Sequence, residues 1–161
     1  MKAALPYAAL TSALVAADQA IKLLVEAHLP FEHAVPLMPM LSLYRTWNPG
    51  ISFTLLAGFG PAALVALALA VTIFVLALAA RTPSGETAAR LGYAMIVAGA
   101  LGNLIDRIAY GHVVDYILLH TRDWSFSVFN LADASISVGA ALVVLQEIVN
   151  FRRERRRPAG D

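Results

Sequence analysis

Three aspartates between residues 102 and 133 lie in or beside apolar runs: Asp106, Asp115 and Asp133. An ionised side chain inside hydrocarbon costs about 2.5 to 3.5 kcal/mol even on the mildest scale, so acids in such places indicate a function. Two carboxyls a few ångströms apart do not both ionise easily. One then keeps a proton near neutral pH while the other acts as a base on water, and such a pair can hydrolyse a peptide bond without a cofactor.

Two pairs of polar residues share a helical spacing. Asn103 and Asp106 are three residues apart at the end of one apolar segment, and Asn130 and Asp133 are three residues apart at the start of another. Positions i and i+3 lie on the same face of a helix. Each pair therefore directs an amide and a carboxyl toward one place.

A third polar pair interrupts the first apolar segment. Asp18 and Lys22 are one helical turn apart, with the acid on the N-terminal side, which is the favourable order for an ion pair. We expect these two side chains to neutralise each other, and we prefer this interpretation to direct catalysis by Asp18.

Other roles for the acids remain open on the residues alone. Asp106 adjoins Arg107 and Asp115 can reach Arg122, so ion pairing explains any single aspartate. Ion pairing does not, however, require several Asn and Asp residues at one depth. A small proton- or cation-coupled transporter, with the acids as a relay, is the main alternative function, and a noncatalytic membrane scaffold is a third.

The sequence gives little support for other kinds of functional site. Cysteine is absent, which excludes disulfides, thiolate metal sites and a cysteine nucleophile. The four histidines are not paired with serine at helical spacing and form no His-Glu-x-x-His motif, so we expect neither a metal ion nor another cofactor. The net charge is +1 and the basic residues cluster at one end of the chain, which gives no sign of a nucleic-acid partner.

The composition is that of a membrane protein. Of the 161 residues, 59% are hydrophobic and 14% are charged, against about 25% charged in an ordinary soluble domain. We expect an all-α membrane protein with four transmembrane helices in a single domain, residues 1–161, and with a small β-sheet and loops at the outer membrane surface. The spans are expected at about residues 3–25, 61–80, 88–106 and 130–151.

The first span begins like a cleavable signal peptide. Lys2 precedes an apolar run, and residues 15–17 are small enough for a cleavage site. Apolar character resumes at Ile21 and brings the run to the ~20 residues that a span needs, so we expect this segment to be retained.

Residues 28–60 and 107–129 are expected at the outer surface. Residues 41–47 alternate as in a strand, and residues 51–55 can form a partner strand across a turn. The second segment is rich in β-branched residues around Asp115, so this acid is expected within a strand or an extended segment.

Charge predicts the orientation. Eight basic residues, five of them in the tail 152–161, lie on the side of the termini and three lie on the other side, which favours termini in the cytoplasm. The polar residues of interest then gather near the outer face. Four segments that are distant in sequence thus place polar residues at one depth in the membrane, which is hard to explain by chance.

Five motifs, in order and over nearly the whole chain, resemble the lipoprotein signal peptidases, the type II signal peptidases of bacteria, which are membrane aspartyl endopeptidases. The motifs are Asp18-Gln19 with Lys22, Asn48-Pro49-Gly50-Ile51-Ser52-Phe53, Gly102-Asn103-Leu104-Ile105-Asp106-Arg107, Val113-Val114-Asp115-Tyr116 and Phe129-Asn130-Leu131-Ala132-Asp133. Ile51 and Ser52 stand where small residues are usual in the family, and Tyr116 stands where Phe is common.

The resemblance implies that Asp115 and Asp133 are the catalytic pair of an aspartyl endopeptidase. The residues that it implies as supporting or substrate-binding are Asp18, Lys22, Asn48, Gly50, Asn103, Asp106, Arg107 and Asn130. Among these, we expect Asp106, beside Arg107, to hold the site together.

The resemblance also implies a substrate and a place. The substrate is a prolipoprotein whose cysteine carries a diacylglyceryl group, and the cut falls just before that cysteine. The place is the bacterial inner membrane, with the site near the outer face, membrane lipids around it and a monomeric chain.

Overall fold

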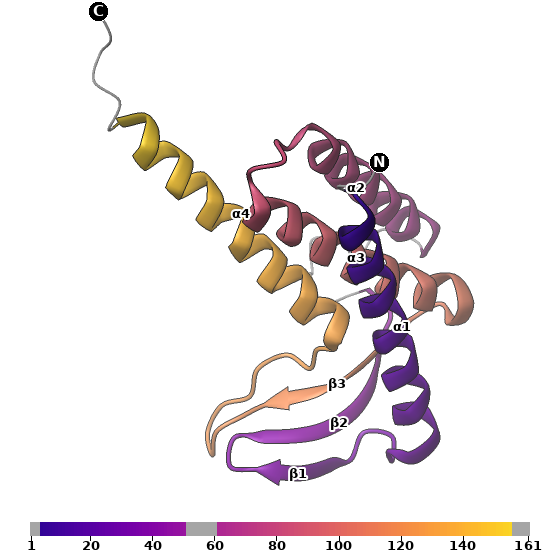
Figure 1. The fold of residues 1–161 in the computed structure, drawn as a ribbon. Coiled ribbons are helices and arrows are strands. Elements are labelled where there is room, and N and C mark those ends of the chain that lie inside the picture. Colours follow the sequence, from indigo (N-terminus) through magenta and orange to yellow (C-terminus); the bar gives the residue numbers. More distant parts are fainter. Residues whose placement is uncertain (1–3, 51–60, 156–161) are drawn as a thin grey trace, which may run out of the picture.

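The computed structural model describes residues 4–50 and 61–155. Within these ranges it contains four long helices and one antiparallel sheet of three strands (Figure 1). The elements in chain order are α1 (Leu5–His28), β1 (Ala34–Met38), β2 (Leu41–Asn48), α2 (Pro61–Arg81), α3 (Thr87–Tyr110), β3 (Val113–Leu119) and α4 (Leu131–Arg155). All four helices are long and apolar enough to cross a membrane, so the expected helical membrane fold with a small sheet is confirmed.

Helix α3 is the central helix and packs against α1, α2 and α4. Small residues let α4 approach closely: Gly92 faces the backbone carbonyl of Gly139, and Gly99 faces the backbone carbonyl of Ala132, with no room for a Cβ atom at either glycine. The C-terminal half of α4 extends away from the other helices (Figure 1). The start of α4 is therefore held firmly against the middle of α3.

The sheet lies at one end of the bundle, beside the C-terminal part of α1 (Figure 1). Strand β2 is the middle strand and pairs with β1 and β3. Strand β1 was not expected, because it contains Pro36, but an edge strand tolerates proline. The partner strand expected at residues 51–55 lies outside the described residues. Asp115 lies within β3, opposite Thr46 of β2, which confirms its expected place in a strand.

Helix α3 continues beyond the end expected at Asp106. It runs to Tyr110, where Gly111 takes a left-handed conformation (φ 77°) and donates its N–H to the carbonyl oxygen of Arg107 at 3.1 Å. The polar residues near Asp106 look like a helix end in sequence, but they are interior positions of a helix whose stop signal is the glycine.

We predict that Gly99→Ala destabilises the protein. Its new Cβ would collide with the carbonyl group of Ala132 and with Ile136, and overpacking of this kind costs about 1–3 kcal/mol. Thermal unfolding in detergent measures the loss. Gly85→Ala is the control, because a Cβ at that position has no neighbouring atom within 4 Å. Equal stability of the two variants would contradict tight packing of α4 on α3.

Candidate active site

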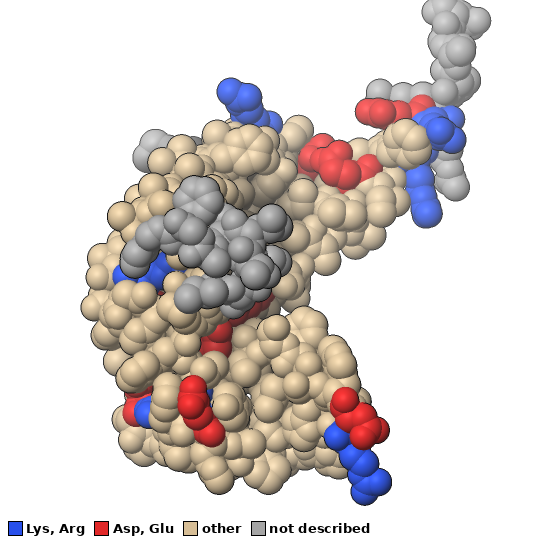
Figure 2. Space-filling view, turned by 180° about the vertical axis from the view of Figure 1, so that it is seen from behind, with Lys and Arg blue, Asp and Glu red and all other residues tan. Residues whose placement is uncertain are grey.

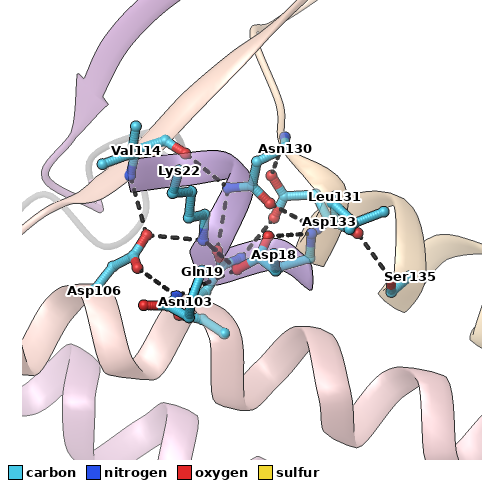
Figure 3. Close-up of polar contacts among 12 residues, drawn as sticks. Asp18, Gln19, Lys22, Asn103, Asp106, Val114, Asn130, Leu131, Asp133 and Ser135 are labelled. Atoms are coloured by element: carbon cyan, nitrogen blue, oxygen red, sulfur yellow. Dashed lines mark hydrogen bonds and ion pairs between the residues drawn. The ribbon is translucent and has the colours of Figure 1, made fainter. Parts of the chain in front are cut away.

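Polar side chains from α1, α3, β3 and α4 meet at the end of the bundle nearest the sheet (Figure 3). The sequence predicted ten residues for this site. The structure joins eight of them in one hydrogen-bonded network, and it places the other two, Gly50 and Arg107, at its edge. The eight are Asp18, Lys22, Asn48, Asn103, Asp106, Asp115, Asn130 and Asp133.

Lys22 of α1 is at the base of this network. Its side chain is buried, and its ammonium group contacts Asp18 Oδ2 at 2.8 Å, Asp106 Oδ2 at 2.8 Å and Asn103 Oδ1 at 3.0 Å. An ammonium group has three protons, so each can be donated to one acceptor. The expected pair of Asp18 and Lys22 is confirmed, but the cation is shared with a second carboxylate on α3.

Lys22 also determines which way the amide of Asn103 faces. Lysine can only donate, so the atom that faces it must be the amide oxygen. The amide nitrogen of Asn103 then faces α4, where it donates to Asp133 Oδ1 at 2.7 Å. The buried cation thereby supplies a correctly oriented donor to a candidate catalytic acid.

Asn130 and Asp133 form a reciprocal cap at the start of α4. The Asp133 N–H donates to Asn130 Oδ1 at 2.9 Å, and the Asn130 N–H donates to Asp133 Oδ2 at 3.1 Å. This pattern is a capping box, which satisfies backbone donors that a helix start otherwise leaves unpaired. The spacing of three residues seen in the sequence thus belongs to a helix cap.

Two more backbone donors of α4 are satisfied by other elements. Ala132 donates its N–H to Asp18 Oδ1 at 3.0 Å, and Leu131 donates its N–H to the Tyr116 hydroxyl at 3.2 Å. Asp18 approaches closely because α3 has Gly102 there, where a Cβ atom would lie 2.6 Å from Asp18 Oδ2. Asp18 is therefore a cap for α4 as well as a partner of the lysine.

Asp115 is held by two asparagines. Asn130 donates its amide nitrogen to Asp115 Oδ1 at 2.7 Å, and Asn48 donates its amide nitrogen to Oδ2 at 3.0 Å. The amide oxygen of Asn48 in turn accepts the N–H of Gly50 at 2.9 Å, which explains why this turn belongs to the site. The described partners of Asp115 thus do not include Arg122, the cation considered as its alternative partner.

The carboxyl of Asp115 is buried and has a raised pKa. Only 2% of this residue is exposed, and burial raises the pKa of its carboxyl to about 6. The negative charge of Asp133 also contributes to raising this pKa, and the hydrogen bonds from Asn48 and Asn130 lower it, so the value of about 6 is the net result. A carboxyl in this state can hold a proton near neutral pH.

Asn130 connects the two candidate catalytic acids. Its side chain bonds Asp115 and its backbone N–H bonds Asp133, while its amide nitrogen also lies 3.1 Å from Asn103 Oδ1. Asn130 has no exposed surface. Asp115 and Asp133 are therefore linked through one shared partner, Asn130.

Asp106 was expected to hold the site together beside Arg107, and the contacts that the structure gives it are with other residues. Asp106 contacts Lys22, accepts the side-chain amide of Gln19 at 2.9 Å, and accepts the N–H of Val114 at 3.2 Å. Arg107 instead donates to a backbone carbonyl of its own helix, four residues earlier, at 3.2 Å. Asp106 still supports the site, but it does so by joining α3 to α1 and β3.

Two contributing residues were not predicted as part of the site. Gln19, next to Asp18 in the first motif, bonds Asp106. Tyr116 bonds the start of α4 through a hydroxyl that phenylalanine lacks. The neighbouring motif residues were the available signal for Gln19, whereas the role of Tyr116 depends on where α4 starts.

Both candidate acids open onto cavities. A cavity of about 360 Å³ reaches Asp115, and one of about 430 Å³ with aromatic walls reaches Asp133. Acidic side chains are visible inside the hollow between the helices and the sheet (Figure 2). The two cavities thus border two carboxyls, one of which can hold a proton. Such a pair supports acid–base hydrolysis.

Comparison with known proteins identifies the family of this chain. Residues 10–149 match the family model described as Signal peptidase (SPase) II. The lipoprotein signal peptidase of Mesorhizobium japonicum is 59% identical over 92% of this chain and 89% of its own length, and that of Sinorhizobium fredii is 54% identical over 94% and 91%. A solved bacterial membrane enzyme, 22% identical, shares the fold over 96% of this chain and 94% of its own, with a TM-score of 0.83. The chain belongs to the signal peptidase II family of membrane proteases.

Proposed function

We propose that this protease is an aspartyl endopeptidase that removes the signal peptide from diacylglyceryl-modified prolipoproteins, cutting just before the lipidated cysteine. The observation that carries the proposal is the pairing of Asp115 and Asp133 through Asn130. The relatives named lipoprotein signal peptidase support the class of substrate.

The environments of the two acids suggest different roles. Asp115 is buried in β3 and its raised pKa, about 6, favours the protonated form. Asp133 lies in the first turn of α4, where the helix dipole stabilises negative charge, and both its oxygens accept N–H donors. We assign Asp115 as the acid and Asp133 as the base.

The proposed reaction proceeds without a covalent intermediate. Asp133 takes a proton from water as the water oxygen attacks the scissile carbonyl carbon, and Asp115 donates its proton to the carbonyl oxygen. The tetrahedral diol then collapses. Asp133 passes its proton to the leaving amine nitrogen, the C–N bond breaks, and the diol proton returns to Asp115. The signal peptide leaves with a new carboxyl group and the lipidated cysteine with a new amine.

Topology fits a substrate that is anchored in the bilayer. The site residues come from the last turns of α1 and α3 and the first turn of α4, which places them at one end of the spans. The basic last turn of α4, with Arg152, Arg153 and Arg155, and the ends of the spans near Arg81 and Arg90 lie at the other end, which favours termini in the cytoplasm and a site near the outer face. A substrate with two acyl chains can enter sideways from the membrane. We also propose that the active form is a monomer.

Asp115→Asn and Asp133→Asn should each lower cleavage by about 10²–10⁴-fold, because each removes one proton carrier and keeps the shape of the side chain. The assay is cleavage of a purified diacylglyceryl prolipoprotein by the purified membrane protein. Asp123→Asn, an exposed acid in the loop before α4, is the matched control and should cleave normally. Activity that survives either of the first two changes would refute the assignment, and proton flux without proteolysis would favour a transporter.

The pH profile provides a second test. Since the pKa of Asp115 in the free protein is about 6, kcat/KM should fall about tenfold for each pH unit above this value. Asn48→Ala removes a hydrogen bond that lowers this pKa, so the falling limb should move to higher pH. A limb that stays in place, or moves to lower pH, would contradict the role of Asp115 as the acid.

Lys22→Met should lower stability by about 3–5 kcal/mol, because it leaves Asp18 and Asp106 buried without a cation. Thermal unfolding in detergent measures the change. Glu26→Gln, one turn further along α1, breaks a partly exposed pair with Arg45 and should cost at most about 1 kcal/mol. Similar losses for the two variants would show that the buried lysine is not a structural centre.

A further inference from the structure

The two cavities that border the candidate acids differ in chemistry. The cavity at Asp115, about 360 Å³ in volume, includes the polar side chains of Thr46, Asn48 and Ser127 in its lining. The cavity at Asp133, about 430 Å³ in volume, is otherwise lined by apolar and aromatic side chains and one serine. Polar groups suit a peptide backbone, whereas apolar walls suit hydrocarbon. The two acids therefore stand between surroundings of different kinds.

One wall of the cavity at Asp133 is a face of α4. Ser137 in this wall donates its hydroxyl to the backbone carbonyl oxygen of Asp133 at 2.9 Å, so its polar group already has a partner within the helix. Ala134 and Val138 complete the wall. From Asp133 to Val138 the wall continues about 7.5 Å along α4, away from the sheet and toward the middle of the membrane.

The other wall is a row of aromatic rings from the segment between β3 and α4. The ring centres of Trp124 and Phe126 are 5.9 Å apart, and those of Phe126 and Phe129 are 6.2 Å apart. Trp124 is 59% exposed and Phe126 is 51% exposed, whereas Phe129 precedes the buried Asn130 of the site. Contiguous exposed apolar side chains of this kind mark a binding surface.

Hydrogen bonds to the sheet hold this aromatic row in place. Phe126 donates its N–H to the carbonyl oxygen of Leu119 at 2.7 Å. At the base of the loop, Nε2 of His120 lies 2.8 Å from the hydroxyl oxygen of the buried Ser42 in β2. The aromatic wall is therefore preformed, as is usual in a ligand site.

We propose that this cavity binds an acyl chain of the substrate, between the rings of Trp124 and Phe126 and the α4 wall. The inference rests on the proposed function, in which the lipidated cysteine directly follows the scissile bond. Hydrocarbon attached to that residue must fit within reach of Asp133, where the cavity begins. A chain that leaves Asp133 along α4 runs toward the hydrocarbon core, and the length of the wall favours an acyl chain over a side chain of the signal peptide.

Two synthetic prolipoprotein substrates that differ only in acyl length, dipalmitoyl and dioctanoyl, test this proposal with the purified full-length protein. Ser137→Leu fills the cavity and should lower kcat/KM for the dipalmitoyl substrate, relative to the dioctanoyl one, about tenfold, because displacing two methylene groups costs about this much. Ala140→Leu, exposed on α4 and outside the lining, is the matched control and should leave the ratio unchanged.

A loss in Ser137→Leu that is equal for both substrates would assign the cavity to a side chain of the signal peptide and overturn the proposal. The same ratio in Ser137→Leu and Ala140→Leu would overturn it as well. Cleavage of either substrate by the unaltered protein tests the proposed function separately, so failure of the inference and failure of the function are distinguishable.

Fluorescence locates the acyl chain without cleavage, and it decides the question if Ser137→Leu does not fold. The protein has two tryptophans, Trp47 at the cavity of Asp115 and Trp124 in the aromatic row, so Trp47→Phe and Trp124→Phe each leave one. Each change is combined with Asp115→Asn, and a substrate with brominated acyl chains, which quench tryptophan on contact, is added. Trp124 should lose more fluorescence than Trp47. Equal losses, or a larger loss at Trp47, would overturn the proposal.

Discussion

The site depends on the contacts that the buried ammonium group of Lys22 makes. Burying a charge is costly unless it is paired and hydrogen-bonded, and here three acceptors surround one cation. Two of them, Asp106 and Asn103, lie on α3, so the same contact fixes α1 against α3. Because the amide oxygen of Asn103 must face the lysine, its nitrogen must face Asp133. The buried Lys22 therefore orients the side chain of Asn103, which in turn donates to Asp133.

At the start of α4, the same side chains cap the helix and belong to the proposed catalytic site. Asp133 is the third residue of α4, closes the capping box and is also the proposed base, while Asn130 is the N-cap and also a donor to Asp115. Asp18 and Tyr116 supply the remaining acceptors from α1 and β3. A helix start that other elements must complete is correctly placed only when the whole protein is folded. The proposed catalytic pair therefore forms together with the packing of α1, α3 and β3.

Local patterns in the sequence were sufficient for much of this arrangement. Apolar length predicted the spans, and the pair of Asp18 and Lys22 followed from helical spacing alone. The contact between Lys22 and Asp106 could not be predicted from helical spacing. It joins two separate helices, whose approach depends on Gly102. Adjacency suggested Arg107 as the partner of Asp106, but neighbouring residues on a helix point in different directions.

Two further features needed the tertiary structure. Strand β1 was missed because Pro36 argues against a strand unless the strand is known to be at an edge. The hydroxyl of Tyr116 acquires its role only because α4 begins beside β3. Motifs therefore identified most of the residues that meet in the network, while the direction of each hydrogen bond depended on contacts between distant segments.

The titration of Asp115 beside Asp133 can be observed directly by infrared spectroscopy of the purified protein over a pH series. A protonated-carboxyl band should disappear with a midpoint near pH 6 and should be missing in Asp115→Asn. In Asp133→Asn the midpoint should move to lower pH, because the neighbouring negative charge that raises the pKa of Asp115 is gone. A protein with no carboxyl that titrates near pH 6, or a midpoint that ignores the change at Asp133, would contradict a coupled pair.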